Sequence, residues 1–396
     1  MTKIKNTKNA TAARNGCLQN DNAIGRGLKL CATVALLASG SLAMTTAQEN
    51  VIKLPEQVIT ADKESRPLAE TGSSVSVITD ADIQRKGYTF LTDALRDTPG
   101  VFVRRNGGPG SSTSVSLRGL GGNQTLYLID GFEINDSSQT SGPLNVGQLP
   151  LDNIERIEVV RGAQSTLYGS EAMGGVINII TKKGEQEPSV NVKAEAGSFE
   201  TRQGSVSVRG ARGQWDFNAF ASYYEDEGFS SASSNNAFAA PVDLDDDDGY
   251  ENTAFQGSLG YEINPHARVE GFINFANSVV EIEQGSSDDE TETDQLIAGL
   301  RSNLTLLDGQ LTSKPSVSVT DTKNETGPSS PSNLEGQTYS LQWDNVYNPD
   351  AYEWLSFLGG LDYQNDEAED TLQPFDENRD SAAAYLQGRF NYEDRL

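Results

Sequence analysis

The sequence contains little of the chemistry that most enzymes use. Its only cysteines are Cys17 and Cys31, and its only histidine, His266, follows Pro265 in a short turn-like stretch. We find no arrangement typical of a Ser-His-Asp hydrolase, no Cys/His metal cluster and no phosphate-binding G-x-x-x-x-G-K-[ST] loop. These absences predict a protein that is not an enzyme.

Positive charge and long apolar runs are also scarce. The chain has 30 Lys and Arg against 57 Asp and Glu, a net charge of −27. So acidic a surface repels nucleic acid, and we expect no nucleic-acid partner. The apolar run from Leu30 to Ala38 is too short to span a bilayer as a helix, which needs about 20 residues.

The N-terminal segment has the three parts of an export signal. Six cations between Lys3 and Lys29 precede the apolar run, and small residues follow it up to Ala47. We predict that residues 1–47 are a signal peptide; a disordered N-terminus is the alternative. Both cysteines lie inside this segment, so the exported chain would have no thiol and no disulfide.

Residues 70–184 combine short strand-like runs with two helical patches and many glycine-rich turns. Thr79 and Asp82 have the spacing of a capping box at a helix start, and Pro99-Gly100 ends a second helix. The expected strands are Ser74–Ile78, Val101–Arg104, Val115–Leu117, Leu126–Ile129, Ile157–Val160 and Val176–Ile180. This pattern predicts a compact α+β domain.

From residue 185 onward, segments of about ten residues alternate apolar with polar, and tight turns alternate with long acidic loops. A soluble β-sandwich also alternates, but its strands are shorter and do not need loops of this length. An export signal together with such strands predicts an outer-membrane β-barrel. The expected fold is therefore an α+β plug domain followed by the first part, about ten strands, of a transmembrane antiparallel β-barrel over residues 185–396.

A barrel in lipid must pair its first strand with its last, because an open edge leaves backbone groups unsatisfied. The sequence stops at the charged tail 393–396. Either the barrel is small, or the chain is an N-terminal fragment of a longer protein; the large domain ahead of the strands favours the fragment.

Three motifs connect the sequence to a known family: ALRDTPGV at 94–101, SLRGLGGNQTLYLIDG at 116–131 and IERIEVVRGAQSTLYGSEAMGGVINIITKKG at 154–184. With them the chain resembles the TonB-dependent outer-membrane transporters, in which a plug domain sits inside a barrel of about 22 strands. The resemblance implies an energy-coupled receptor in the outer membrane of a Gram-negative bacterium, in contact with outer-membrane lipid. A passive porin is the alternative from another class, and it would lack both the plug motifs and a coupling segment.

Two sets of residues acquire roles from this resemblance. Arg118, Arg161 and Glu171 would anchor the plug by meeting charged residues of the barrel lumen; ordinary surface ion pairs are the alternative. The tail 48–69 holds a stretch similar to the energy-coupling box that such receptors present to the periplasmic transducer TonB by strand addition. The box residues are Pro55, Glu56, Gln57, Val58, Ile59, Thr60 and Ala61. A plain first strand of the plug is the alternative reading.

Within the family the chain resembles the cobalamin receptors in its apical turns. Carried over by position, the ligand-contacting residues would be Ser112, Ser114, Gly121, Gln139 and Thr140. The resemblance implies import of a scarce nutrient, with cobalamin (a corrinoid) as the expected ligand. A ferric-siderophore receptor, which binds an iron chelate, is the main alternative within the family; an ordinary polar loop is the alternative for these residues.

The acidic run Asp245–Asp248 lies in the loop 225–249. Closely spaced aspartates supply the hard oxygen ligands that Ca²⁺ prefers. Asp246 and Asp248 match the alternating pair of the cobalamin receptors, so the resemblance implies a Ca²⁺ site in an extracellular loop. No other cofactor is expected, and a solvated acidic loop is the alternative.

Overall fold

The computed structural model describes residues 57–61, 63–138, 146–229, 247–284, 287–327, 331–352, 354–370, 372 and 375–390, which belong to one compact unit. The predicted signal peptide lies outside the described residues, as do Pro55, Glu56, Gln139, Thr140 and Asp246. None of the described helices has the length and hydropathy of a membrane span.

The plug is an α+β domain built on a five-stranded sheet of order β3-β8-β9-β6-β7. Only the pair β6 and β9 is parallel; the other neighbours are antiparallel. The strands of the plug are β1 (Gln57–Val58), β2 (Arg66–Pro67), β3 (Ser74–Thr79), β4 (Val101–Arg105), β5 (Thr113–Leu117), β6 (Thr125–Ile129), β7 (Phe132–Glu133), β8 (Ile154–Arg161) and β9 (Gly175–Thr181). The helices are α2 (Asp80–Lys86), α3 (Leu91–Arg96) and α4 (Ser165–Tyr168).

Local sequence sets the boundaries of α2. The Thr79 side chain accepts a hydrogen bond from the Asp82 N–H, and the Asp82 carboxylate accepts one from the Thr79 N–H, which is the predicted capping box. The helix ends at Gly87, whose φ of 66° is left-handed and suits glycine. The plug has an apolar core, in which Leu95, Leu117, Ile157 and Ile177 are all 0% exposed.

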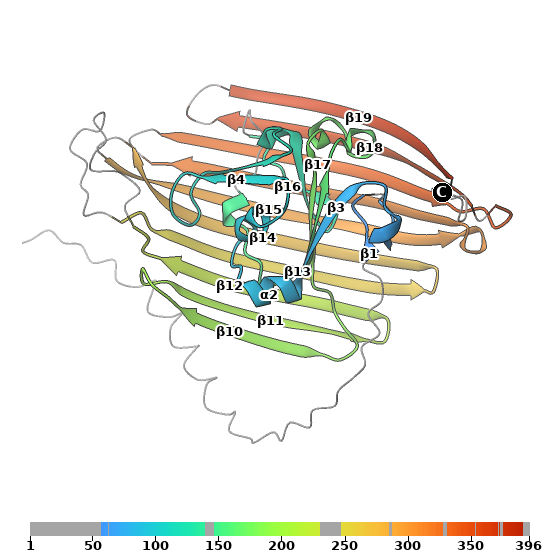
Figure 1. Cartoon of the computed structure of the whole chain (residues 1–396), viewed down its shortest axis with the longest axis horizontal. Coiled ribbons are helices and arrows are strands. Elements are labelled where there is room, and N and C mark those ends of the chain that lie inside the picture. Colours follow the sequence, from blue (N-terminus) through green and yellow to red (C-terminus); the bar gives the residue numbers. More distant parts are fainter. Residues whose placement is uncertain are drawn as a thin grey trace, which may run out of the picture. The chain divides into compact units, whose positions relative to one another are not determined.

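Ten long strands follow in a continuous antiparallel meander, each paired with the next (Figure 1). They are β10 (Ser189–Ala196), β11 (Arg202–Arg212), β12 (Trp215–Asp226), β13 (Tyr250–Asn264), β14 (Ala267–Gln284), β15 (Ser287–Leu306), β16 (Leu311–Thr326), β17 (Ser332–Tyr347), β18 (Leu355–Asp370) and β19 (Phe375–Phe390). In the described residues β10 and β19 do not pair with each other. The predicted fold, a plug domain followed by about ten antiparallel strands, is confirmed.

The two faces of the large sheet differ in chemistry. Side chains on one face are apolar and exposed: Trp215, Phe217, Phe255, Leu259, Leu300, Leu341, Trp343 and Leu361. Side chains on the other face are polar and buried: Asn218, Gln256, Asn274, Gln295 and Thr338. Alternation of this kind, apolar outward and polar inward, is typical of strands that face lipid on one side and a lumen on the other.

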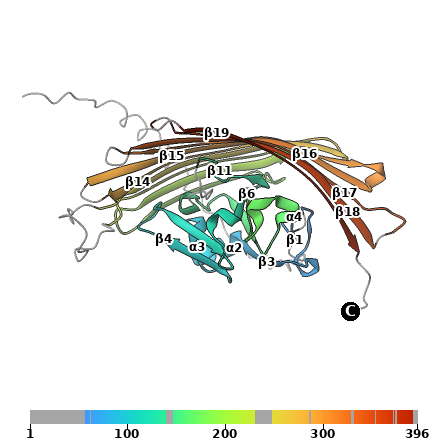
Figure 2. The same cartoon turned by 90° about the horizontal axis from the view of Figure 1, so that it is seen from above.

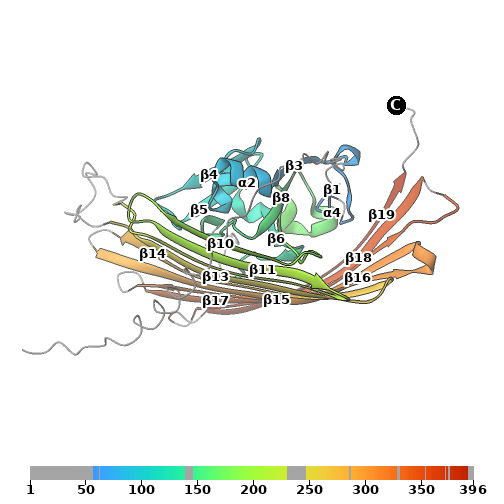
Figure 3. The same cartoon turned by 90° about the horizontal axis from the view of Figure 1, so that it is seen from below.

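The plug lies against one face of the sheet (Figures 2 and 3). Hydrogen bonds between Asn153 of the plug and both Gln256 and Asn218 identify this face as the polar one. A few apolar contacts join the plug and the sheet: the rings of Phe132 and Phe272 stack with centroids 4.2 Å apart, and Phe90 packs against Tyr224 and Tyr250. The remaining contacts are largely polar; for example, the Asn153 amide donates to Gln256 at 2.9 Å. Lys183, just after β9, lies 2.7 Å from the Glu270 carboxylate of β14, which also pairs with Arg268 and Arg301.

Candidate functional site

The first candidate site is the apex of the plug, the turn that joins β4 to β5. Gly110 in this turn has a φ of +72°, and a side chain there would meet the Tyr250 ring at 2.1 Å. Tyr250 begins β13, directly after the long acidic loop, and its ring packs edge-on against Phe90 with centroids 5.7 Å apart. The apex is therefore seated against the strand end that receives the loop.

The structure separates the predicted ligand residues into two places. Ser112 and Ser114 are exposed at the apical end of β5, whereas exposed Gly121 follows the other end of that strand. These three residues therefore do not form one pocket. Gln139 and Thr140 lie outside the described residues.

Sequence reasoning missed an aromatic and basic face beside the apex. Phe102 and Arg104 pair with Ser116 and Ser114 across β4 and β5, and both side chains are exposed, Phe102 by 65%. Alternate residues of a strand share a face, so the pattern Phe-Val-Arg could have indicated this surface.

The second candidate site is the coupling segment. Gln57–Val58 form β1, which pairs antiparallel with Arg66–Pro67. Val58, Thr60 and Ala61 are at most 3% exposed, whereas Gln57 is exposed and Ile59 is 37% exposed. The segment thus lies docked in the plug in this structure.

Lys63, two residues after the segment, connects it to the large sheet. Its ammonium lies 3.1 Å from Asp344 of β17 and 3.9 Å from Asp362 of β18. It also lies over the rings of Tyr168 and Tyr385, 5.0 and 4.8 Å from their centroids. Sequence reasoning missed this contact, which the lysine two residues after the coupling motif could have indicated.

The two candidate sites are at opposite ends of the strands. The apex contacts the start of β13, beside the long loop that precedes Tyr250. Lys63 contacts Asp344, three residues before β17 ends at Tyr347, and β18 begins shortly afterwards at Leu355. In outer-membrane barrels the long loops are extracellular and the short turns periplasmic. In that orientation the apex would lie outside and the predicted coupling segment inside.

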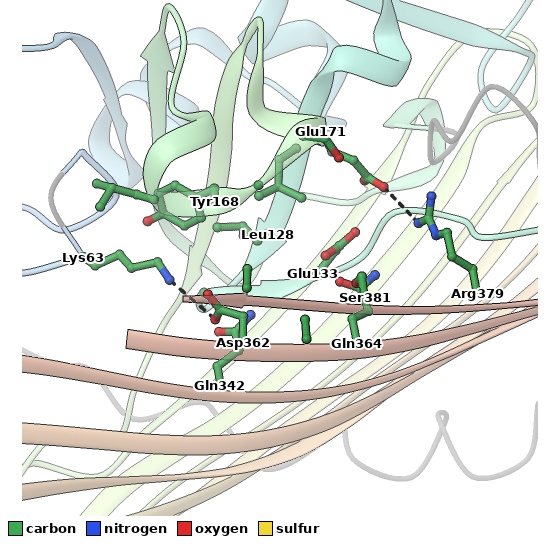
Figure 4. A pocket seen from close by; sticks show the side chains of 17 residues that line it. Lys63, Leu128, Glu133, Tyr168, Glu171, Gln342, Asp362, Gln364, Arg379 and Ser381 are labelled. Atoms are coloured by element: carbon green, nitrogen blue, oxygen red, sulfur yellow. Dashed lines mark ion pairs between the residues drawn. The ribbon is translucent and has the colours of Figure 1, made fainter. Parts of the chain in front are cut away.

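A cavity of about 360 Å³ separates the plug from β17–β19 (Figure 4). At one end Lys63 points toward Asp362; at the other the Glu171 carboxylate lies 3.5 Å from Arg379. The Asn135 amide donates to the same Glu171 side chain at 2.8 Å. Glu133 lines the cavity between these two ends.

Carboxylates crowd around Glu133. Burial, then the charge and hydrogen bond of Glu171, then the charge of Asp366 raise the pKa of the Glu133 carboxyl well above its usual range. Arg379 acts in the opposite direction and does not cancel them. We therefore expect Glu133 to retain its proton in conditions where an exposed glutamate is ionised.

The three predicted plug-anchoring residues differ in their surroundings. Glu171 faces Arg379 of β19, as described above. Arg161 donates to the Pro99 carbonyl and, at 2.9 Å, to the Ser76 hydroxyl, both inside the plug. Arg118 is exposed, and no ion pair involves it or Arg161 among the residues that the structure describes.

For the predicted Ca²⁺ pair the structure describes only Asp248, which is 8% exposed near the apex, with its carbonyl oxygen beside Gly108. Asp246 lies outside the described residues. In the described part of the chain no group of three or more His, Cys, Asp or Glu is arranged to hold a metal ion.

Residues 67–176 match the family model of the TonB-dependent receptor plug domain. The chain is also 30% identical over 343 residues to the vitamin B12 transporter BtuB of Photobacterium profundum, covering 85% of this chain and 54% of that protein. The chain belongs to the TonB-dependent outer-membrane receptors. This membership confirms the predicted outer-membrane location.

A second relative carries a different description. The chain is 36% identical over 250 residues to the iron-regulated outer membrane virulence protein of Vibrio cholerae, covering 60% of this chain and 36% of that one. The chain spans about half the length of the vitamin B12 transporters that it matches, and about a third of the length of the virulence protein.

Solved receptor structures share the fold. The alcaligin receptor FauA of Bordetella pertussis superposes with a TM-score of 0.68 at 18% identity, covering 85% of this chain and 55% of that one. The siderophore receptor PirA of Pseudomonas aeruginosa gives 0.61 at 23% identity, covering 79% and 52%. At these identities the similarity concerns the fold alone.

Replacing Gly110 with alanine tests the contact between the apex and Tyr250. Gly87→Ala is the matched control, because Gly87 is also left-handed but has no atom within 4 Å of an added Cβ. Gly87→Ala should cost about 1–2 kcal/mol from backbone strain, and Gly110→Ala about 1–3 kcal/mol more from the collision with Tyr250. Thermal unfolding measures both, and equal losses would contradict the contact.

Replacing Glu133 with glutamine tests the raised pKa. When the pKa of a carboxyl is higher in the folded than in the unfolded state, the protein loses stability as the pH rises from the unfolded pKa of about 4.3 to the folded pKa. The reason is that the carboxyl ionises first in the unfolded state. The midpoint of thermal unfolding should therefore decrease more between pH 5 and pH 8 in the native chain than in Glu133→Gln. The exposed Glu155→Gln is the control, and parallel pH dependence of native chain and Glu133→Gln would contradict the assignment.

Proposed function

We propose that this chain forms the ligand-binding and energy-coupling part of a receptor that imports a scarce nutrient across the outer membrane, with cobalamin as the ligand. The observation that carries the proposal is the placement of two elements at opposite ends of one sheet. The apex lies at the long-loop end, and the coupling segment lies at the short-turn end beside Lys63. Ligand arrival and energy input would thus act on the same small domain from opposite sides.

Several features support cobalamin as the ligand. Relatives named vitamin B12 transporters match up to 85% of the chain. The apical residues Ser112 and Ser114 are small, polar and exposed, and they suit hydrogen bonds to the amide-rich edge of a corrinoid. The acidic loop next to Tyr250 would order around Ca²⁺ through Asp246 and Asp248, whose carboxylate oxygens are ligands of the kind that this ion prefers.

A ferric-siderophore receptor is the second candidate. The exposed pair Phe102 and Arg104 favours it, because an aromatic ring and a guanidinium can bind an aromatic, anionic iron chelate. The relative described as an iron-regulated virulence protein supports the same reading. A passive porin fits poorly, because the plug occupies the polar face of the sheet.

Equilibrium binding to the detergent-solubilised receptor separates the two ligands and tests the calcium site. Cobalamin should bind more tightly than each member of a ferric-siderophore panel. Its affinity should fall on chelation of Ca²⁺ by the size of a typical coupling free energy, about 1–3 kcal/mol or 5–150-fold. Cobalamin would be rejected as the ligand if a siderophore bound more tightly or if none of the ligands bound.

The loop aspartates provide the matched variants for this measurement. Asp246→Asn with Asp248→Asn should remove the calcium dependence and leave the weaker, calcium-free affinity. Asp308→Asn with Asp350→Asn removes the same charge from exposed turns at the opposite end of the sheet, and should leave the dependence intact. Equal cobalamin affinity with Ca²⁺ and with chelator in the native receptor would rule out the site.

Val58→Pro tests energy coupling. Proline removes the N–H that an added strand would use, so uptake should be abolished while surface binding of ligand persists. Val58→Ala keeps the N–H and loses only side-chain packing, and it should retain most uptake. Radiolabelled ligand uptake into cells, beside binding at 4 °C, measures both; loss of binding together with uptake would show that the segment is structural.

A further inference from the structure

Every polar group of Thr60 is bonded to a plug side chain. Its N–H and its hydroxyl donate to Glu158 Oε2 at 2.8 and 2.7 Å. The same hydroxyl oxygen accepts from Asn178 Nδ2 at 3.0 Å, and the carbonyl accepts from the Tyr168 hydroxyl at 2.9 Å. Thr60 is 0% exposed, so the centre of the coupling segment is held like a core residue.

Glu158 is the hub of these contacts. Its side chain is 0% exposed, and Oε2 accepts a further hydrogen bond from the Ile59 N–H at 2.9 Å. Its other oxygen, Oε1, accepts from Arg156 Nε at 2.9 Å. A buried carboxylate is costly unless such charge-assisted bonds compensate for lost hydration, so Glu158 and the segment stabilise each other.

The geometry at Glu158 is incompatible with an extended strand. Successive N–H groups of a strand point to opposite sides, yet the N–H groups of Ile59 and Thr60 converge on one oxygen atom. Such convergence belongs to a turn that cradles an anion. The described segment is extended only at Gln57–Val58, so pairing with a partner's sheet through Ile59 and Thr60 requires Glu158 to release them.

We propose that Glu158 is a positioning residue that holds the coupling segment in a closed, non-extended form, and that the segment becomes available for strand addition only after these contacts break. This inference rests on the proposed energy-coupled function and adds to it the group that sets the closed state. Tyr168 extends the clamp to the cavity, because it contacts Thr60 and also lines the space shared with Glu171 (Figure 4).

Thiol accessibility measures release directly. The sequence has no cysteine after Cys31, so Ala61→Cys (Ala61 is 3% exposed) provides a reporter beside Thr60 in the exported chain, with any other thiol of the receptor removed. In detergent, Glu158→Gln should raise the maleimide labelling rate at position 61 about tenfold or more, because the charge and one acceptor oxygen are lost. Thr60→Val, which loses only the hydroxyl, should raise it roughly fivefold.

Glu155→Gln is the matched control, because Glu155 lies on the same strand and pairs with the same Arg156, at 2.6 Å, without contacting the segment. Ala94→Cys (Ala94 is 1% exposed, in α3) reports opening of the plug core. Labelling at position 61 that is equal in Glu158→Gln and Glu155→Gln would overturn the proposal. A parallel rise at position 94 would also overturn it, since Glu158 would then support the whole plug.

The same variants separate this clamp from the proposed function. Faster labelling at position 61 in Glu158→Gln, combined with unchanged ligand uptake in Val58→Pro, would support the clamp and reject energy coupling through the segment. Faster labelling together with loss of uptake in Val58→Pro would support both.

Discussion

The polar inward face of the large sheet governs how the plug and the strands can fit together. In lipid every backbone polar group must be paired, so the strands form a continuous ladder whose side chains alternate between a lipid face and a lumen face. The lumen face carries buried amides and hydroxyls such as Asn218, Gln256 and Thr338. A domain that covers this face must therefore bind it chiefly through hydrogen bonds and ion pairs.

That requirement gives the plug two different kinds of contact. Its own interior, around Leu95, Leu117 and Ile157, is apolar and fully buried, so the domain can hold together by itself. Apart from small apolar contacts such as Phe132–Phe272 and Phe90–Tyr250, its contact with the sheet rests on polar pairs such as Lys63–Asp344, Lys183–Glu270 and Glu171–Arg379. Polar contacts can exchange for water at little net cost, whereas apolar burial cannot. The seam, rather than the core, is therefore where we expect movement during transport.

The coupling segment shows the same principle on a smaller scale. Val58 is buried in the plug, but the bonds that hold Ile59 and Thr60 run to one carboxylate, that of Glu158. The opposite end of the plug is held by close packing, because the ring of Tyr250 occupies the space that a side chain on Gly110 would need. Movement of the segment would thus require hydrogen bonds to break, whereas movement of the apex would require packed side chains to separate.

Most secondary-structure elements could be predicted from the sequence, because each depends on near neighbours in the chain. Capping at Thr79, the left-handed Gly87 and the period-two alternation of ten long strands are all local, and the family motifs fixed the order of plug and sheet. Which residues meet was decided only by the tertiary structure. Thr60 and Glu158 are 98 positions apart and Lys63 and Asp344 are 281 apart, so no local pattern pairs them. Ser112 and Gly121 are close in sequence but at opposite ends of β5, because an extended strand carries residues apart as fast as the backbone allows.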